Sequence, residues 1–165
     1  MEKKAEVKET KKKIVAPKLF FKENDKIEIS LDAYHNNETG ELSFVVPSDN
    51  TDFKDDTSLN ELFNKVVYKF WFTRIPYDKL NRYRSRSMIY NSEDQNNTIN
   101  ELRLREFFLI FHLVDWNITD ENGEKIELTF DMNKTLSDES LKIIYSLPSS
   151  LIDTVLTTFE RKLGL

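Results

Sequence analysis

The sequence contains no cysteine, which excludes disulfide bonds, thiolate nucleophiles and the usual structural zinc sites. Only three glycines occur in 165 residues, too few for a glycine-rich phosphate loop, so nucleotide-driven catalysis is not expected. No apolar run approaches the roughly 20 residues of a membrane span, so no membrane contact is expected. Proline is also scarce while Phe and Tyr are plentiful, which indicates a packed core built from long elements.

The chain has only two histidines, and neither lies in a metal-ligand pattern. His35 falls in an expected loop, and His112 lies inside an apolar stretch, where a hydrogen-bonded core histidine is the better interpretation. Carboxylates are abundant, but they fall in expected loops and on exposed faces. We therefore assign no catalytic residue, no metal ligand and no cofactor, and expect a protein that is not an enzyme.

The formal net charge of −5 argues against a general nucleic-acid coat or a membrane-surface protein. Residues 2–13 carry six Lys and three Glu with little apolar content, so residues 1–17 are predicted to form a flexible basic arm. This terminus has no apolar export signal, which predicts cytoplasmic synthesis. Residues 18–165 are predicted to form a single α+β domain, with 18–75 mainly β and 76–165 mainly α.

In the first half, residues 26–31 and 41–46 alternate polar and apolar side chains, which predicts two half-buried strands paired as a hairpin. Their connection contains residues that tolerate positive φ: Asn36, Asn37 and Gly40. Residues 66–73 are dense in branched and aromatic side chains and are predicted to form a central strand. The expected fold class is α+β, with a small N-terminal antiparallel β-sheet followed by a C-terminal helical bundle.

In the second half, apolar residues recur at helical spacing after Pro76, which leaves Lys79, Arg82 and Arg86 exposed. The Thr98-Ile-Asn-Glu101 sequence resembles a capping box and predicts a long apolar helix to about Trp116. Asn122-Gly123 predicts a turn within a small hairpin or an extended excursion. Further helices are predicted to start at Ser137 and Pro148, and the last carries one apolar side and a glycine stop: Leu151, Val155, Phe159, Leu163 and Gly164.

Residues 70–90 alternate basic and aromatic side chains. Arg84 and Arg86 could bridge phosphates while Tyr83 or Tyr90 stacks on a base, as single-strand binding requires. Alternatively, the aromatic residues are core and the arginines form a solvated face. We keep Arg82, Arg84 and Arg86 as candidate contacts to nucleic acid or to an acidic partner.

Several motifs over residues 70–160 resemble the tail-assembly chaperones of long-tailed bacteriophages. These chaperones share an F-x-R/K-L/I-x-Y/F segment, a helix ending in V-x-W, an acidic D-x-x-G turn, a Ser-initiated acidic helix and an L-P-x-x-hydrophobic start. The matching stretches, in order, are Phe72-Thr-Arg-Ile-Pro-Tyr-Asp-Lys-Leu80, Val114-Asp-Trp116, Asp120-Glu-Asn-Gly123, Ser137-Asp-Glu-Ser-Leu141 and Leu147-Pro-Ser-Ser-Leu151. The basic arm and residues 84–95 depart from the pattern.

The resemblance implies a non-enzymatic protein that binds the phage tape-measure protein, keeps its hydrophobic helices soluble and brings tail-tube subunits to it. It would act in the cytoplasm of the bacterial host during assembly, and self-association is also considered. The apolar helix and the last helix would supply the partner surface, although each residue is alternatively plain core: Phe107, Phe108, Phe111, Trp116, Leu151, Val155 and Phe159. Two other functions stay open, a virion structural protein of the head, neck or tail, and a small nucleic-acid-binding protein using residues 70–90.

Overall fold

The computed structural model describes residues 25–36, 38–46, 63–92 and 95–165. The predicted basic arm, residues 1–17, lies outside the described residues. Those residues contain an antiparallel sheet early in the chain and four helices that are mostly C-terminal, so the α+β fold class is confirmed. Residues 76–165 nevertheless contribute three strands as well as the helices.

The main sheet has four strands in the order β2-β1-β3-β6, and all its neighbours are antiparallel. The strands are β1 (Lys26–Asn36), β2 (Leu42–Val45), β3 (Phe63–Thr73) and β6 (Leu113–Trp116). The predicted pairing of the first two strands is confirmed, and β3 lies inside the sheet as expected. Its inward residues Phe70 and Phe72 are opposite Ile29 and Ile27 of β1, which gives the sheet a continuous apolar face.

β1 continues to Asn36, five residues beyond its predicted end, because it pairs with β3 along its whole length. Of the three residues expected to adopt positive φ, Gly40 does so at 71°. Asn37 lies outside the described residues. The expectation for Asn36 was wrong: its side-chain oxygen instead accepts hydrogen bonds from the backbone N–H groups of Glu38 and Thr39, which shapes the turn without a left-handed backbone.

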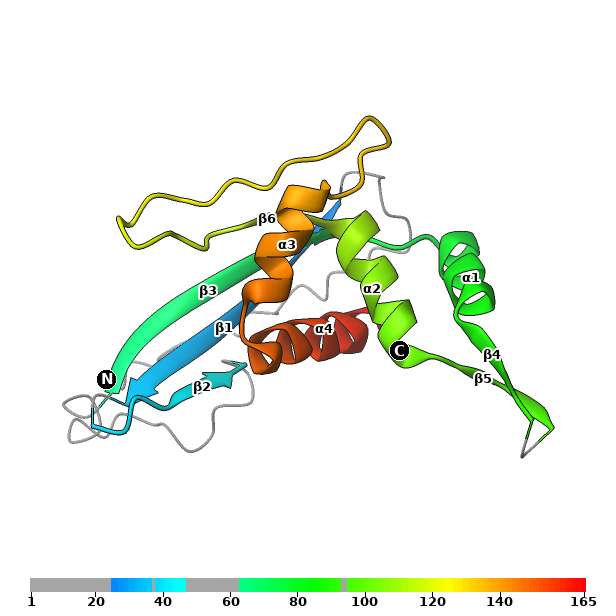
Figure 1. The fold of residues 1–165 in the computed structure, drawn as a ribbon, viewed down its shortest axis with the longest axis horizontal. Helices are drawn as coiled ribbons and strands as arrows, with labels where there is room; N and C mark the ends of the chain where they lie inside the picture. Colours follow the sequence, from blue (N-terminus) through cyan, green and yellow to red (C-terminus); the bar gives the residue numbers. More distant parts are fainter. Residues whose placement is uncertain (1–24, 37, 47–62, 93–94) are drawn as a thin grey trace, which may run out of the picture.

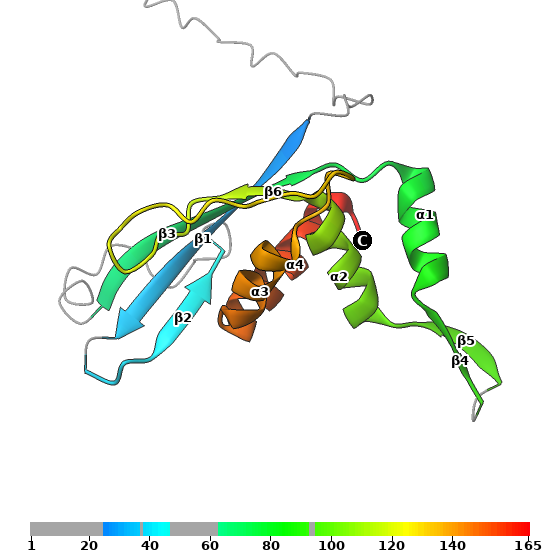
Figure 2. The ribbon, with the colours of Figure 1, turned by 45° about the horizontal axis from the view of Figure 1, so that its top comes forward.

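The helices are α1 (Tyr77–Arg86), α2 (Glu101–His112), α3 (Asp138–Ser146) and α4 (Ser149–Leu163). Ser137 caps α3 by accepting a hydrogen bond from Ser140 N, and Pro148 precedes α4, so both predicted helix starts are confirmed. Gly164 ends α4 in the left-handed region, as expected. α2, α3 and α4 lie on one face of the main sheet (Figure 2).

Both predicted ends of the long apolar helix need correction. α2 begins after Asn100, whose side chain accepts a hydrogen bond from Arg103 N, and Thr98 belongs to a strand instead. It ends at His112, because Leu113 adopts extended backbone angles and residues 113–116 pair with β3. An all-round apolar run fits a buried strand as well as a buried helix, so periodicity could not place this boundary.

The core lies where the sheet meets the helices. Phe72 of β3 stacks on Phe159 of α4 with ring centroids 4.3 Å apart, and Phe108 of α2 meets Phe159 edge-on at 5.8 Å. Phe70 contacts Trp116 of β6 edge-on at 6.3 Å. All five rings are almost fully buried, so aromatic packing joins three secondary-structure elements to β3.

Residues 117–136 form an extended excursion that runs alongside β6 (Figure 1). Trp116 Nε1 donates a 2.6 Å hydrogen bond to Ile126 O, which fixes the middle of the excursion to the core. The predicted Asn122-Gly123 turn is present, with Gly123 at a φ of 80° and a bridge between Thr119 and Lys125. A second bridge, between Phe130 and Leu136, closes a turn just before α3.

Residues 88–99 form an antiparallel hairpin that the sequence pattern did not predict, β4 (Met88–Asn91) with β5 (Asn96–Ile99). The helical spacing predicted after Pro76, which is met by Leu80, Tyr83 and Ser87 or Met88, continues past the observed helix, because α1 ends at Arg86 and Ser87 caps it. We call α1 and this hairpin the distal lobe. Figures 1 and 2 show that the lobe projects beyond α2, away from the main sheet.

Two buried serines provide a matched test of this packing. Ser140 Oγ accepts a hydrogen bond from Thr129 N at 2.8 Å, whereas Ser87 Oγ has no hydrogen-bond partner among the described residues, and both side chains are buried. Ser140→Ala should therefore lower the free energy of unfolding by about 1–3 kcal/mol. Ser87→Ala should leave it unchanged or raise it by up to about 1 kcal/mol, because it removes an unsatisfied hydroxyl.

Urea titrations of the wild-type chain and both alanine variants would measure this difference. Equal losses of stability in the two variants would contradict the assignment of the Ser87 hydroxyl as unsatisfied.

Candidate functional site

The distal lobe exposes the densest group of large apolar side chains in the described residues. In the hairpin, Met88, Tyr90 and Ile99 are 50%, 66% and 39% exposed. Met88 is directly opposite Ile99 in the register, and Tyr90 lies two residues along β4, so all three side chains point to the same face. We call this set the apolar hairpin face. Leu102 follows Ile99 by three residues, at the start of α2, and is 77% exposed.

An exposed apolar face on a two-stranded hairpin is unusual for a stable free surface. Isolated two-stranded hairpins are marginally stable in water, and three or more strands or a packed helix normally support them. The opposite face of this hairpin is more polar, with Ile89 set among Asn91, Asn96 and Thr98. Large apolar side chains exposed together on a projecting element are a common feature of protein contact surfaces.

Backbone hydrogen bonds close the base of the lobe, and aromatic contacts hold it against α2. Asn100 N donates to Ser87 O at 2.8 Å, which ties the end of β5 to the end of α1. Ser87 N donates to Tyr83 O at 2.9 Å. Tyr83 also packs its ring against Phe107 and Phe111 of α2, with centroids 5.3 Å and 5.7 Å apart. The hairpin is thus anchored at its base.

His112 is the buried polar residue that joins α2 to the lobe. Its Nδ1 atom lies 2.8 Å from Thr73 Oγ1, and its Nε2 atom lies 3.0 Å from the Tyr83 hydroxyl. A neutral imidazole has one donor and one acceptor nitrogen, and the two hydroxyls can complement both. Burial lowers the pKa of His112 to about 4, with a smaller contribution from the charge of Lys79. The structure therefore confirms the prediction that His112 is a core histidine whose ring nitrogens are hydrogen-bonded.

Most of the residues predicted to form a partner surface are core residues in this structure. The chain's own packing buries five of the seven, which therefore cannot contact a partner without leaving the core: Phe108, Trp116, Leu151, Val155 and Phe159. Phe107 is half-buried, and Phe111 is 38% exposed. The structure brings Phe107 and Phe111 together beside Tyr83, at the junction of α1 and α2.

The three candidate arginines all lie on α1. Arg82 and Arg86 are exposed and four residues apart, so they share one face of the helix. Arg84 is half-buried. Arg82 makes a 3.5 Å ion pair with Asp78, and both side chains are largely exposed, so this pair contributes little to stability. The predicted exposure of Lys79 is also confirmed.

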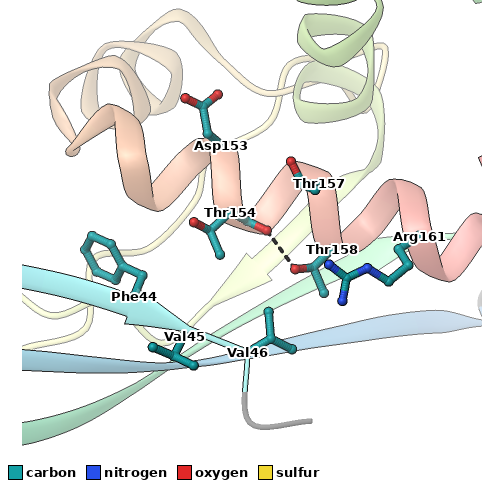
Figure 3. A pocket seen from close by; sticks show the side chains of 8 residues that line it. All are labelled: Phe44, Val45, Val46, Asp153, Thr154, Thr157, Thr158 and Arg161. Atoms are coloured by element: carbon teal, nitrogen blue, oxygen red, sulfur yellow. Dashed lines mark hydrogen bonds between the residues drawn. The ribbon is translucent and has the colours of Figure 1, made fainter. Parts of the chain in front are cut away.

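A groove of about 340 Å³ lies between β2 and α4 (Figure 3). Thr158 Oγ1 donates to Thr154 O at 2.7 Å, so this hydroxyl is already used within α4. Asp153 is the single carboxylate of the lining, and it lies 3.8 Å from Arg105. The groove thus offers apolar and hydroxyl contacts but no pair of carboxylates for acid–base chemistry. Its lining is Phe44, Val45, Val46, Asp153, Thr154, Thr157, Thr158 and Arg161.

The described ranges 25–36, 38–46, 63–92 and 95–165 were searched for a metal-binding group and for a membrane-spanning helix, and neither is found there. No group of three or more His, Asp or Glu side chains there is arranged to hold a metal ion. None of the helices in these ranges has the length and apolar content needed to cross a membrane.

Comparison of the chain with protein-family models, with curated proteins and with solved structures gives no match.

The buried histidine predicts a specific pH dependence of stability. Unfolded His112 has an ordinary pKa near 6.5, whereas the folded value is about 4. As the pH falls below 6.5, the unfolded chain binds a proton that the folded chain excludes, so stability is complete above pH 6.5 and is lost toward pH 4. The free energy of unfolding should fall by roughly 2 kcal/mol between pH 7 and pH 5.

Urea titrations across this range measure the effect, and His112→Gln supplies the control because an amide keeps two hydrogen-bonding atoms without titrating. The variant should lose most of the slope between pH 7 and pH 5. A variant with the same slope as the wild-type chain would assign the pH dependence to other groups.

Proposed function

We propose that the chain is a non-enzymatic binding protein of bacteriophage morphogenesis, and specifically a tail-assembly chaperone for the tape-measure protein and tail-tube subunits. The observation that carries the binding role is the apolar hairpin face: Met88, Tyr90 and Ile99 are exposed together on a projecting hairpin. The phage assignment comes from the resemblance of residues 70–160 to tail-assembly chaperones.

A chaperone for hydrophobic helices needs an apolar contact surface surrounded by charge, so that the complex stays soluble. The distal lobe has this combination. Its hairpin exposes three large apolar side chains, while the adjacent α1 exposes Lys79, Arg82 and Arg86. The buried core residues of α2 and α4 are not needed for this contact, so the lobe replaces them as the proposed partner surface.

The motifs that carry the resemblance fall at boundaries between elements. The segment 72–80 joins β3 to α1, Trp116 ends β6, Ser137 caps α3, and Pro148 separates α3 from α4. Such positions are under local conformational constraint in any protein. The resemblance therefore supports a similar order of elements, and the partner assignment needs a direct test.

The first alternative is a virion structural protein incorporated at the head, neck or tail, for which the same hairpin would contact a neighbour permanently. Quantitative mass spectrometry of purified particles and of the lysate of the parent phage distinguishes the two. We expect abundance in the lysate and absence from particles for a chaperone. If the chain is instead retained in particles in stoichiometric amounts, the chaperone hypothesis is wrong and the chain is a virion structural protein.

The chaperone proposal predicts that the chain keeps a co-expressed tape-measure segment in the soluble fraction. Met88→Ser and Tyr90→Ser together should abolish this effect while leaving the fold intact, because both side chains are exposed. Val66→Ser is a matched control, since Val66 is also in a strand and is 48% exposed, close to the 50% of Met88. The soluble fraction of the segment is the measurement.

Loss of the effect in the Val66 variant, or its persistence in the double variant, would show that the hairpin face is not the contact. Circular dichroism of each variant confirms that the comparison is between folded chains.

The second alternative is a small nucleic-acid-binding protein, favoured by the basic residues of α1. Its prediction is retention on single-stranded DNA or RNA that falls steeply with salt. Under our proposal retention is weak, and replacing Arg82, Arg84 and Arg86 together with Ala does not change it. Strong, salt-sensitive retention that this triple variant removes would instead support nucleic-acid binding.

A further inference from the structure

The groove between β2 and α4 follows the edge of the main sheet. β2 is the edge strand on this side of the described sheet, and three consecutive residues at its end line the groove, Phe44, Val45 and Val46. Consecutive side chains of a strand point to opposite faces, so the groove runs along the strand rather than over one face. α4 forms the opposite wall from Asp153 to Arg161 (Figure 3).

The backbone of β2 also presents hydrogen-bonding groups on this edge. Asn36 N donates to Glu41 O at 2.9 Å, and bonded and non-bonded pairs alternate from there along the register with β1. The backbone groups of Leu42 and Phe44 therefore point away from β1, toward the open side of the sheet. An extended segment can pair with such an edge, as in β-strand addition.

The dimensions and lining of the groove fit an extended apolar segment. Eight residues of helix separate Asp153 from Arg161, a length of about 12 Å, which accommodates roughly four residues of extended chain. Phe44 and Val46 are half-buried against the core and supply apolar contacts, and Thr157 is exposed on the opposite wall.

The start of β1 lies close to one end of this groove. Lys162, the residue after Arg161, donates from its Nζ atom to Glu28 O at 2.7 Å. The chain that precedes β1 therefore enters the sheet near the Arg161 end. Phe21 is five residues before Lys26, and five extended residues reach up to about 17 Å. The sequence before β1 is thus long enough to reach the groove of its own molecule.

The sequence before β1 contains an apolar segment suited to the groove. Residues 14–21 read Ile-Val-Ala-Pro-Lys-Leu-Phe-Phe, with one charged side chain in eight. They lie outside the described residues, as do residues 47–62. In 47–62 the large apolar residues occur singly and are separated by polar or acidic ones: Phe53, Leu59 and Leu62. Residues 14–21 are therefore the better match to an apolar groove.

We propose that residues 14–21 dock in extended form in the groove between β2 and α4 of the same molecule. Leu19, Phe20 and Phe21 lie nearer the Arg161 end, because the chain continues from there into β1. The docked segment covers the free edge of β2, which would otherwise be open to pairing with other chains. It also removes large apolar side chains from water.

Charge neither drives nor opposes this docking. The groove lining carries one residue of each sign, Asp153 and Arg161. Lys18 lies within the segment, and Lys22 and Glu23 follow it with opposite charges. Apolar contact and backbone pairing therefore provide the attraction, and the docking should depend little on salt.

Cross-linking tests this inference directly, because the chain has no cysteine of its own. The test variant carries Lys18→Cys in the segment and Thr157→Cys on the exposed wall of the groove. A short bismaleimide should join the two thiols within one molecule, as read by mass spectrometry of the digested monomer. The control variant carries Lys18→Cys and Arg82→Cys, since Arg82 is exposed on α1 in the distal lobe. It should cross-link roughly tenfold more slowly, because docking lowers the effective concentration of the segment there.

Equal rates in the two variants, or no cross-link in either, would overturn the proposal. Cross-linked dimers of the test variant would assign the groove to the segment of a second copy and would also overturn docking within one molecule.

A second measurement detects the docking through stability in the full chain. Phe20→Ser and Phe21→Ser together should lower the urea midpoint of unfolding by roughly 1 M, because two packed rings are lost. Val7→Ser is the matched control, since it removes an apolar side chain before the segment, and it should leave the midpoint unchanged. An unchanged midpoint in the double variant would contradict the docking. Both measurements use the chain alone, so neither result bears on the phage partner.

Discussion

The stacking of Phe72 on Phe159 is the contact on which the rest of the structure depends. Phe72 lies on β3, the strand that pairs with both β1 and β6, and Phe159 is the buried centre of α4. Phe108 of α2 meets the same ring edge-on. One aromatic cluster therefore fixes the sheet, the last helix and the helix that leads from the distal lobe. With no cysteine in the chain, this packing has no covalent support.

Much of this arrangement could be predicted from the sequence where one local signal decided the structure. Alternating side chains marked β1 and β2, and Ser137 and Gly164 marked the ends of helices. Residues 113–116 could not be assigned in this way. Their strand forms because β3 offers a free edge to an extended segment, and that pairing is a tertiary effect that leaves no periodic pattern in the four residues Leu113-Val-Asp-Trp116.

The candidate site was harder to predict than the fold, for the same physical reason. Phe108, Trp116 and Phe159 have the composition of a binding surface and of a core alike, and only the packing shows that they are buried. The hairpin was missed because its second strand, Asn96–Ile99, is mostly polar, and its last two residues, Thr98 and Ile99, were interpreted as the start of the next helix. Its partner strand begins at Met88, where helical spacing still fitted the pattern. A contact surface made from exposed residues leaves no burial pattern for sequence analysis to detect.

The place of the distal lobe in the chain has a consequence for how such a protein can change during evolution. The lobe is inserted between β3 and α2, and the backbone hydrogen bond from Asn100 to Ser87 lies at the base of its hairpin, next to the Met88–Ile99 pair. Residues beyond that bond contribute no side chain to the Phe72–Phe159 cluster. Insertions or deletions in the hairpin can therefore alter its length and its exposed side chains while selection on the core continues unchanged.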